Sequence, residues 1–230
     1  MHGGEPFDPD LELRALVAEG HELLGDESPS IAATVFERAI LKSGQRAVEA
    51  AGRAMQRVTL ADAVVGLAQS YVRIGRGSEA LALARQAEHQ ICELVSSNGP
   101  STDLERLQRR CSRAIAGAHQ ALGQHQLATD RYQQLIRSFR RVVVEGGSEA
   151  DDAELSRVLE EAATSALALG RTEAAIDALT GAIKRWRRLC STDGAPVEHR
   201  RRLIRCLRAL AEIETGRGNS RDGEALRAEA

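Results

Sequence analysis

The feature that most constrains this chain is a pattern of small residues that recurs about every 48 positions. The pattern is clearest between Val64 and Ala87, where Gly75 separates two runs whose apolar residues recur at helical spacing. This stretch predicts two amphipathic helices joined by a tight glycine turn. The small residue of the first helix recurs at Gly20, Ala68, Ala116, Ala163 and Ala211, and the turn position at Glu27, Gly75, Gly123, Gly170 and Gly218. Such a repeat is typical of stacked helical units.

The amino-acid composition also indicates an all-helical chain. Aromatic residues make up 3% of it, and the β-branched residues do not alternate as they do in strands. Loop-like clusters at 96–101, 146–148 and 191–196 fall between the repeats. We therefore predict five helical hairpins at about residues 9–46, 57–97, 102–145, 151–190 and 197–230, forming one repeat domain over residues 1–230. The last hairpin is expected to be abbreviated.

The repeated residues resemble the tetratricopeptide repeat (TPR) family. The pattern survives at Leu16, Gly20, Leu23, Ala32, Phe36 and Ala39 in the first unit, and at Leu67, Ala68, Tyr71, Gly75 and Ala80 in the second. The family's usual period is about 34 residues, so this chain is similar to its long-helix bacterial members. The resemblance implies a right-handed α-solenoid whose first helices line a concave groove, and a partner protein or peptide bound in that groove.

The residues in the groove-facing register include several arginines. The candidate binding residues are Arg110, Arg113, Arg157, Arg205 and Arg208, with Gln69, Thr164 and His21 as polar contacts. Guanidinium groups hold carboxylates or phosphates with two hydrogen bonds, so this set would suit an acidic or phosphorylated peptide. The alternative is that these arginines are solvated or pair with neighbouring glutamates. We expect a non-catalytic interaction scaffold or regulatory adaptor.

Charge distribution supplies a second hypothesis. The formal net charge is only −2, but residues 1–30 are acidic, whereas residues 184–208 carry nine bases against two acids. In this basic C-terminal half, the run from Lys184 to Arg188 and its neighbour from His199 to Arg208 would suit a ligand-sensing or nucleic-acid-associated regulatory subunit. Trp186 would then be a stacking platform, or else it is a core residue. The opposite charges of the two ends also fit head-to-tail association of identical chains.

The remaining motifs point away from catalysis and cofactors. The sequence contains no nucleophile elbow, phosphate-binding loop or dinucleotide fingerprint, so we expect no enzyme activity and no cofactor.

The four cysteines form no CxxC pair, and we expect buried free thiols; whether Cys190 and Cys206 approach each other is left open. The histidines lack metal-site spacing, and His119 is expected to be packed. No window is apolar enough to span a bilayer, so a cytoplasmic location is the expectation.

Overall fold

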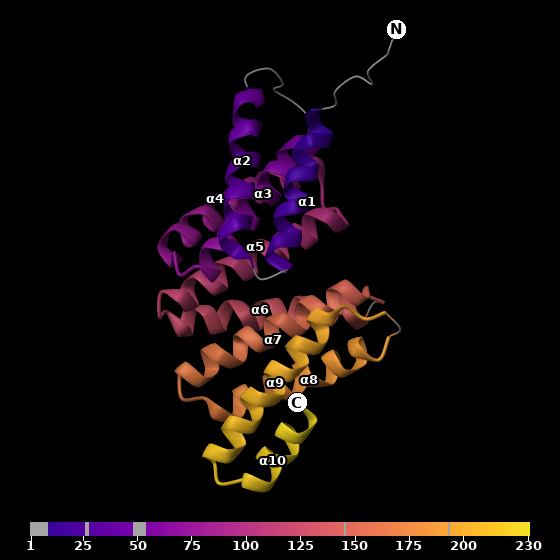
Figure 1. The fold of residues 1–230 in the computed structure, drawn as a ribbon. Helices are drawn as coiled ribbons and strands as arrows, with labels where there is room; N and C mark the ends of the chain where they lie inside the picture. The colour runs from indigo at the N-terminus through magenta and orange to yellow at the C-terminus, as the bar shows by residue number, and fades with distance from the viewer. Residues whose placement is uncertain (1–8, 26–27, 48–53, 145, 193) are drawn as a thin grey trace. The chain divides into compact units, whose positions relative to one another are not determined.

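The computed structural model describes residues 9–25, 28–47, 54–144, 146–192 and 194–230, and all its regular structure is helical (Figure 1). The helices in these ranges are α1 (Pro9–Gly25), α2 (Pro29–Ala47), α3 (Ala54–Arg73), α4 (Gly77–Asn98), α5 (Thr102–Ala121), α6 (His125–Val144), α7 (Glu149–Ala168), α8 (Thr172–Cys190), α9 (Val197–Gly216) and α10 (Ser220–Glu229). The prediction of an all-helical fold is confirmed.

The helices form two compact units, Met1–Leu122 and Gly123–Ala230, which we call unit 1 and unit 2. In unit 1, α1 packs on α2, α3 packs on α4, and α3 also contacts α1, α2 and α5. In unit 2, α7 packs on α6 and α8, and α9 packs on α8 and α10. Because α5 and α6 belong to different units, the single repeat domain over residues 1–230 stays a prediction.

The turn glycine found in the sequence has the conformation that its position requires. Gly75, between α3 and α4, has a φ angle of 81°, which L-residues with a side chain rarely adopt. The same left-handed conformation recurs one repeat later each time, at Gly123, Gly170 and Gly218. The equivalent position in the first hairpin, Glu27, lies outside the described residues.

The small residues of the repeat are the points where helices approach closely. Ala68, Ala116, Ala163 and Ala211 are each at most 1% exposed. In the first hairpin the aromatic ring of Phe36 lies against glycine backbone on two helices. A Cβ added at Gly20 of α1 would lie 2.6 Å from Cζ of Phe36, and one added at Gly66 of α3 would lie 2.3 Å from it. A side chain at either position would therefore collide with the ring.

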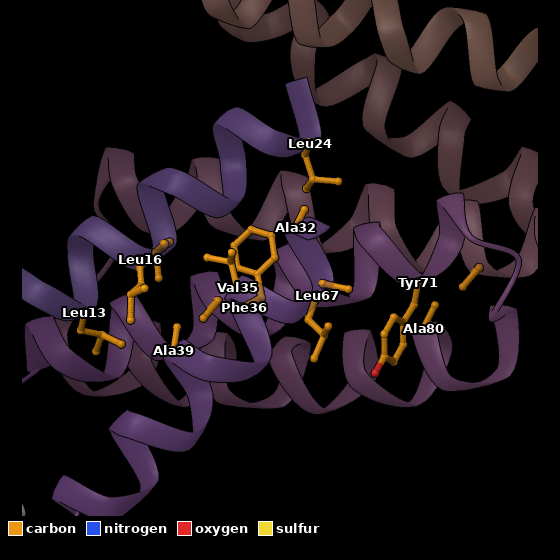
Figure 2. Packing of buried hydrophobic residues seen from close by; sticks show 14 residues of the cluster. Leu13, Leu16, Leu24, Ala32, Val35, Phe36, Ala39, Leu67, Tyr71 and Ala80 are labelled. Carbon is orange, nitrogen blue, oxygen red and sulfur yellow. The ribbon is translucent and has the colours of Figure 1, made fainter. Parts of the chain in front are cut away.

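Phe36 belongs to a cluster of buried residues that joins the helices of unit 1. Figure 2 shows the labelled members of this cluster, including Leu13 and Leu16 from α1 and Leu67 and Tyr71 from α3. The hydroxyl of Tyr71 donates a 2.7 Å hydrogen bond to Glu37, so the ring is buried while its polar end stays satisfied. The cluster fixes the first helices, whose outer surface carries the candidate site.

The last helix is short, as the sequence predicts. Helix α10 has 10 residues, whereas α9 has 20. Gly223 lies 48 residues after Ala175, at a repeat position that carries alanine in the earlier hairpins. A Cβ on Gly223 would lie 2.4 Å from Oγ1 of Thr215 and 3.1 Å from the carbonyl oxygen of Ala211, so this position of α10 has no room for a side chain.

The contact at Gly66 leads to a stability prediction. Gly66→Ala should lower the free energy of unfolding by about 1–3 kcal/mol, because overpacking against Phe36 outweighs alanine's better helix propensity. Chemical denaturation followed by circular dichroism measures this change.

The matched control is Gly25→Ala at the end of α1, where an added Cβ meets no atom within 4 Å. This variant should be neutral or more stable. Equal effects of the two substitutions would contradict the close packing of Phe36.

Candidate functional site

A pocket with a volume of about 400 Å³ lies on unit 1 and is lined by residues of α1, α3 and α5. These are the first helices of the three hairpins that begin in unit 1. We call it the Arg110 pocket; its lining residues are Arg14, Val17, Ala18, His21, Val58, Thr59, Asp62, Asp103, Arg106, Leu107 and Arg110. Its volume falls within the range typical of ligand sites.

Three polar side chains from three helices meet in this pocket. Nη1 of Arg110 on α5 donates a 2.6 Å hydrogen bond to Oδ1 of Asp62 on α3. The same carboxylate oxygen lies 3.2 Å from Nε2 of His21 on α1, and Nη2 of Arg110 lies 2.9 Å from that nitrogen. Asp62 and Arg110 are each about a quarter exposed, so the guanidinium is held in place while part of it still faces solvent.

The network keeps Asp62 ionised. Burial alone would raise the pKa of Asp62, but the hydrogen bond from His21 and the positive charge of Arg110 outweigh it and hold the pKa below its ordinary value of 3.8. The imidazole also packs on the core, since its ring centroid lies 5.0 Å from that of Phe36. The Arg110 guanidinium is therefore oriented by a carboxylate that is charged at neutral pH.

Two further arginines at the pocket are available to a ligand. Arg14 is exposed and has no acidic partner among the described residues. Arg106 is half exposed, and its Nη1 lies 4.0 Å from Asp103, a carboxylate that is itself 86% exposed. A surface pair of that length contributes little. Val17 and Leu107 add buried aliphatic surface to the lining.

The arrangement suits binding of an acidic group beside an aliphatic one. Three arginines face two aspartates in the lining, and one of those aspartates is already engaged by Arg110. A carboxylate or phosphate entering the pocket would meet guanidinium donors, and its neighbouring side chain would meet Val17 and Leu107. Among the described residues, no three His, Cys, Asp or Glu side chains are grouped to hold a metal ion.

The predicted site residues of unit 1 lie near one another. His21 and Arg110 are in contact, and the side-chain amide of Gln69 donates a 3.5 Å hydrogen bond to the backbone carbonyl of Arg110. Arg113, about one turn further along α5, is half-buried and is not part of the lining.

The other predicted residues lie in unit 2, in different surroundings. Arg157 donates a 2.6 Å hydrogen bond to Glu154 in its own helix, and the hydroxyl of Thr164 donates to the backbone carbonyl of Glu160. Nη2 of Arg205 lies 3.8 Å from Oε2 of Glu160, and Arg208 is exposed. Their shared role in one binding groove stays a prediction.

Glu160 is the centre of a buried polar cluster in unit 2. Nε1 of Trp186 donates a 2.6 Å hydrogen bond to it, and Nη1 of Arg202 a 3.3 Å one. Burial raises the pKa of Glu160 above its ordinary value and outweighs the opposing effects of Arg202 and Trp186. Burial likewise raises the pKa of the Cys206 thiol. The cluster ties α7, α8 and α9 together and makes Trp186, which is fully buried, a core residue rather than a stacking platform.

The basic run on α8 is largely neutralised by acidic side chains. Arg185 and Arg188 both pair with the buried carboxylate of Asp152, and Arg187 donates hydrogen bonds of 2.7 and 2.5 Å to Glu229. With Trp186 buried as well, this run lacks the combination of free cations and exposed aromatic surface that single-stranded nucleic acid requires.

The four cysteines are free thiols, in agreement with the sequence. The expectation that all are buried is wrong for Cys92, which is exposed on α4, and Cys190 is only half-buried. Cys111 is buried, and its thiol donates to the carbonyl oxygen of Ala84. His119 is packed as expected, with 7% of its surface exposed.

Sequence reasoning missed Arg106, although the repeat contains the signal for it. Arg106 lies one helical turn before Arg110 and 48 residues after Val58, and all three residues line the pocket. Extending the groove-facing register by one turn toward the start of each first helix would have identified this layer.

Comparison with known proteins places the fold. No protein-family model matches the sequence, and no curated protein matches it. A chain from Podosopora anserina with nearly identical TPR-like repeats, named after kinesin light chain, superposes with a TM-score of 0.60 at 16% identity, covering 95% of this chain and 92% of that one. BtubC from P. vanneervenii gives 0.65 at 18% identity, with coverages of 96% and 87%. A Rap protein complexed with Competence and Sporulation Factor gives 0.65 at 12%, with coverages of 92% and 50%.

These likenesses confirm the TPR-like helical-repeat fold predicted from the sequence. None of the described helices is long and apolar enough to cross a membrane.

The network around Asp62 leads to a pH prediction. Because the pKa of Asp62 is lower in the folded than in the unfolded chain, its ionised form stabilises the fold above the unfolded pKa, and this stabilisation is lost as the pH falls through the folded pKa. Asp62→Asn should therefore cost about 1–3 kcal/mol at pH 7, and the difference from wild type should shrink below about pH 4. Urea denaturation across this pH range measures the difference.

Glu93→Gln is the control, because the pairs that Glu93 forms, with Arg57 at 3.2 Å and with His89 at 3.4 Å, are exposed. It should change stability by less than about 1 kcal/mol at every pH. A constant penalty for Asp62→Asn over the whole range would show that its charge does not stabilise the fold.

Proposed function

We propose that this TPR-like protein is a non-catalytic interaction scaffold that binds an acidic segment of a partner polypeptide in the Arg110 pocket. The observation that carries the proposal is the guanidinium of Arg110, held by Asp62 beside Arg14 and Arg106. A preordered arginine loses less conformational entropy on binding than a free one. A cytoplasmic location, expected from the sequence, is part of the same proposal.

The lining indicates the chemistry of the segment. Arg14 and Arg106 offer solvent-exposed guanidinium donors at the pocket, whereas Val17 and Leu107 offer aliphatic surface. A glutamate or aspartate flanked by aliphatic residues fits both. A Rap protein with a similar fold over half of its chain was solved complexed with Competence and Sporulation Factor, which supports a binding role for this fold.

The alternative of a nucleic-acid-associated subunit finds less support. Its components in the sequence are the basic run on α8, the neighbouring basic run from His199 to Arg208, and Trp186. Three arginines of the α8 run are paired and the indole is buried, so the exposed cations of the second run have no exposed aromatic ring beside them in the described part of unit 2. No feature of the described residues favours this alternative over a polypeptide partner.

A binding measurement with defined peptides tests the proposal. The probe is a fluorescein-labelled, Gly/Ser-rich nonapeptide with Leu-Glu-Leu at its centre, and its twin carries Leu-Gln-Leu. Fluorescence anisotropy should show tighter binding of the glutamate peptide, and Arg14→Gln/Arg106→Gln should weaken it about tenfold or more, because each lost charge-assisted hydrogen bond is worth about 1.5–3 kcal/mol.

The matched control is Arg57→Gln/Arg85→Gln, which removes the same charge from exposed arginines outside the pocket lining. This variant should bind the glutamate peptide within about twofold of wild type. Equal losses in the two double variants would mean that net charge, not the pocket, causes binding.

A further inference from the structure

Unit 2 contains a pairing related to the one that orients Arg110, with its acid at a different repeat position. Asp62, Arg110, Arg157 and Arg205 occupy the same position of successive repeats, 48, 47 and 48 residues apart. In unit 1 an acid on α3 contacts Arg110 on α5, with 2.6 Å between the polar atoms. In unit 2 an acid on α7, Glu160, lies 3.8 Å from Arg205 on α9. In both units an arginine on the first helix of one hairpin thus lies close to a carboxylate from the first helix of the preceding hairpin, with a hydrogen bond in unit 1 and a longer ion pair in unit 2.

One face of α9 extends this arrangement with further cations. Arg201, Arg205 and Arg208 are spaced four and three residues apart, so they lie on one side of the helix. Arg201 occupies the repeat position of Arg106, one turn before the oriented arginine. Val197, at the start of the same side, is 65% exposed. We call these four residues the α9 arginine face.

Two of the three arginines on this face are exposed and have no acidic partner among the described residues, namely Arg201 and Arg208. Most arginines around them are paired: in α7 to α9 and the loop after α9, ion pairs engage Arg157, Arg185, Arg187, Arg188, Arg202 and Arg217. Arg201 and Arg208 therefore differ from these six paired arginines and present unpaired charge on one side of α9.

The spacing of these charges disfavours the helix by itself. Like charges three and four residues apart on a helix repel each other, and Arg201 and Arg208 flank Arg205 at these spacings. An anionic partner lying along α9 would relieve the repulsion and would bind more tightly for that reason.

The surroundings of the face favour a polypeptide as that partner. All three aromatic residues of the described part of unit 2, Tyr132, Phe139 and Trp186, are buried, so the face offers no ring on which a base could stack. It offers instead an exposed aliphatic side chain, Val197, next to guanidinium groups. Cations and aliphatic surface on one helix fit an amphipathic acidic segment.

We propose that the α9 arginine face is a second docking surface, which binds an acidic segment of a partner whose carboxylates are spaced one helical turn apart. This goes beyond the function proposed above, because the face lies in unit 2 and uses no residue of the Arg110 pocket.

The test uses a fluorescein-labelled, alanine-rich peptide with glutamates spaced three and four residues apart, and a twin with glutamines in their place. Binding is measured by anisotropy in the Arg14→Gln/Arg106→Gln background, so that a contribution from unit 1 is removed. Adding Arg201→Gln/Arg208→Gln should weaken binding of the glutamate peptide at least tenfold. The thermal unfolding midpoint should stay the same or rise, because a repulsion is removed.

The matched control adds Arg137→Gln/Arg140→Gln on α6, two arginines that are also exposed and have no acidic partner in the described structure. This control should bind within about twofold of its background. An equal loss in both variants, or equal binding of the glutamine peptide, would overturn the proposal. So would tighter binding of a poly(dT) oligonucleotide that also depends on Arg201 and Arg208, since the occupant would then be nucleic acid. The two proposals can fail separately. If the glutamate peptide still binds α9 while the Leu-Glu-Leu peptide does not bind the Arg110 pocket, only the proposal for the pocket is wrong.

Discussion

The contact of the Phe36 ring with glycine backbone on α1 and α3 is the packing on which the candidate site depends. Because neither Gly20 nor Gly66 carries a side chain, the ring fits between two helices that would otherwise be pushed apart. His21 follows Gly20 directly, and Asp62 lies one helical turn before Gly66. The same close approach that buries Phe36 therefore brings the imidazole and the carboxylate together, with the imidazole centroid 5.0 Å from that of the Phe36 ring and the two rings tilted by 59°.

Buried or half-buried acidic side chains hold several arginines of this protein in place. Asp62 holds Arg110, Glu160 contacts Arg202 and Arg205, and a single buried carboxylate pairs with two arginines of α8. Removing only one partner of such a pair strongly destabilises the fold, because the other charge is left buried and unpaired. The pairs therefore fix the positions of the helices that carry them. Arg14 at the Arg110 pocket and Arg201 and Arg208 on α9 have no such acidic partner among the described residues, and these are the cations that we propose a partner binds.

The repeat made much of this fold predictable from the sequence. Gly75 and its equivalents, the buried alanines and the short last helix follow from the 48-residue spacing, because turn geometry and close packing demand particular residues at fixed positions. The pocket was only partly predictable. Periodicity identified His21 and Arg110 as groove-facing. It could not show that Asp62 pairs with Arg110 or that Trp186 donates a hydrogen bond to Glu160, because such contacts depend on the side-chain conformations of neighbouring helices.

The most direct test of acidic-segment binding is a double-mutant cycle between Arg106 in the protein and the glutamate of the Leu-Glu-Leu peptide. Four affinities are measured, with Arg106 or Gln in the protein and glutamate or glutamine in the peptide. If the two groups interact in the Arg110 pocket, the coupling free energy should be about 1 kcal/mol or more in favour of the charged pair. Additive effects of the two substitutions, with no coupling, would contradict recognition of the acidic side chain by this pocket.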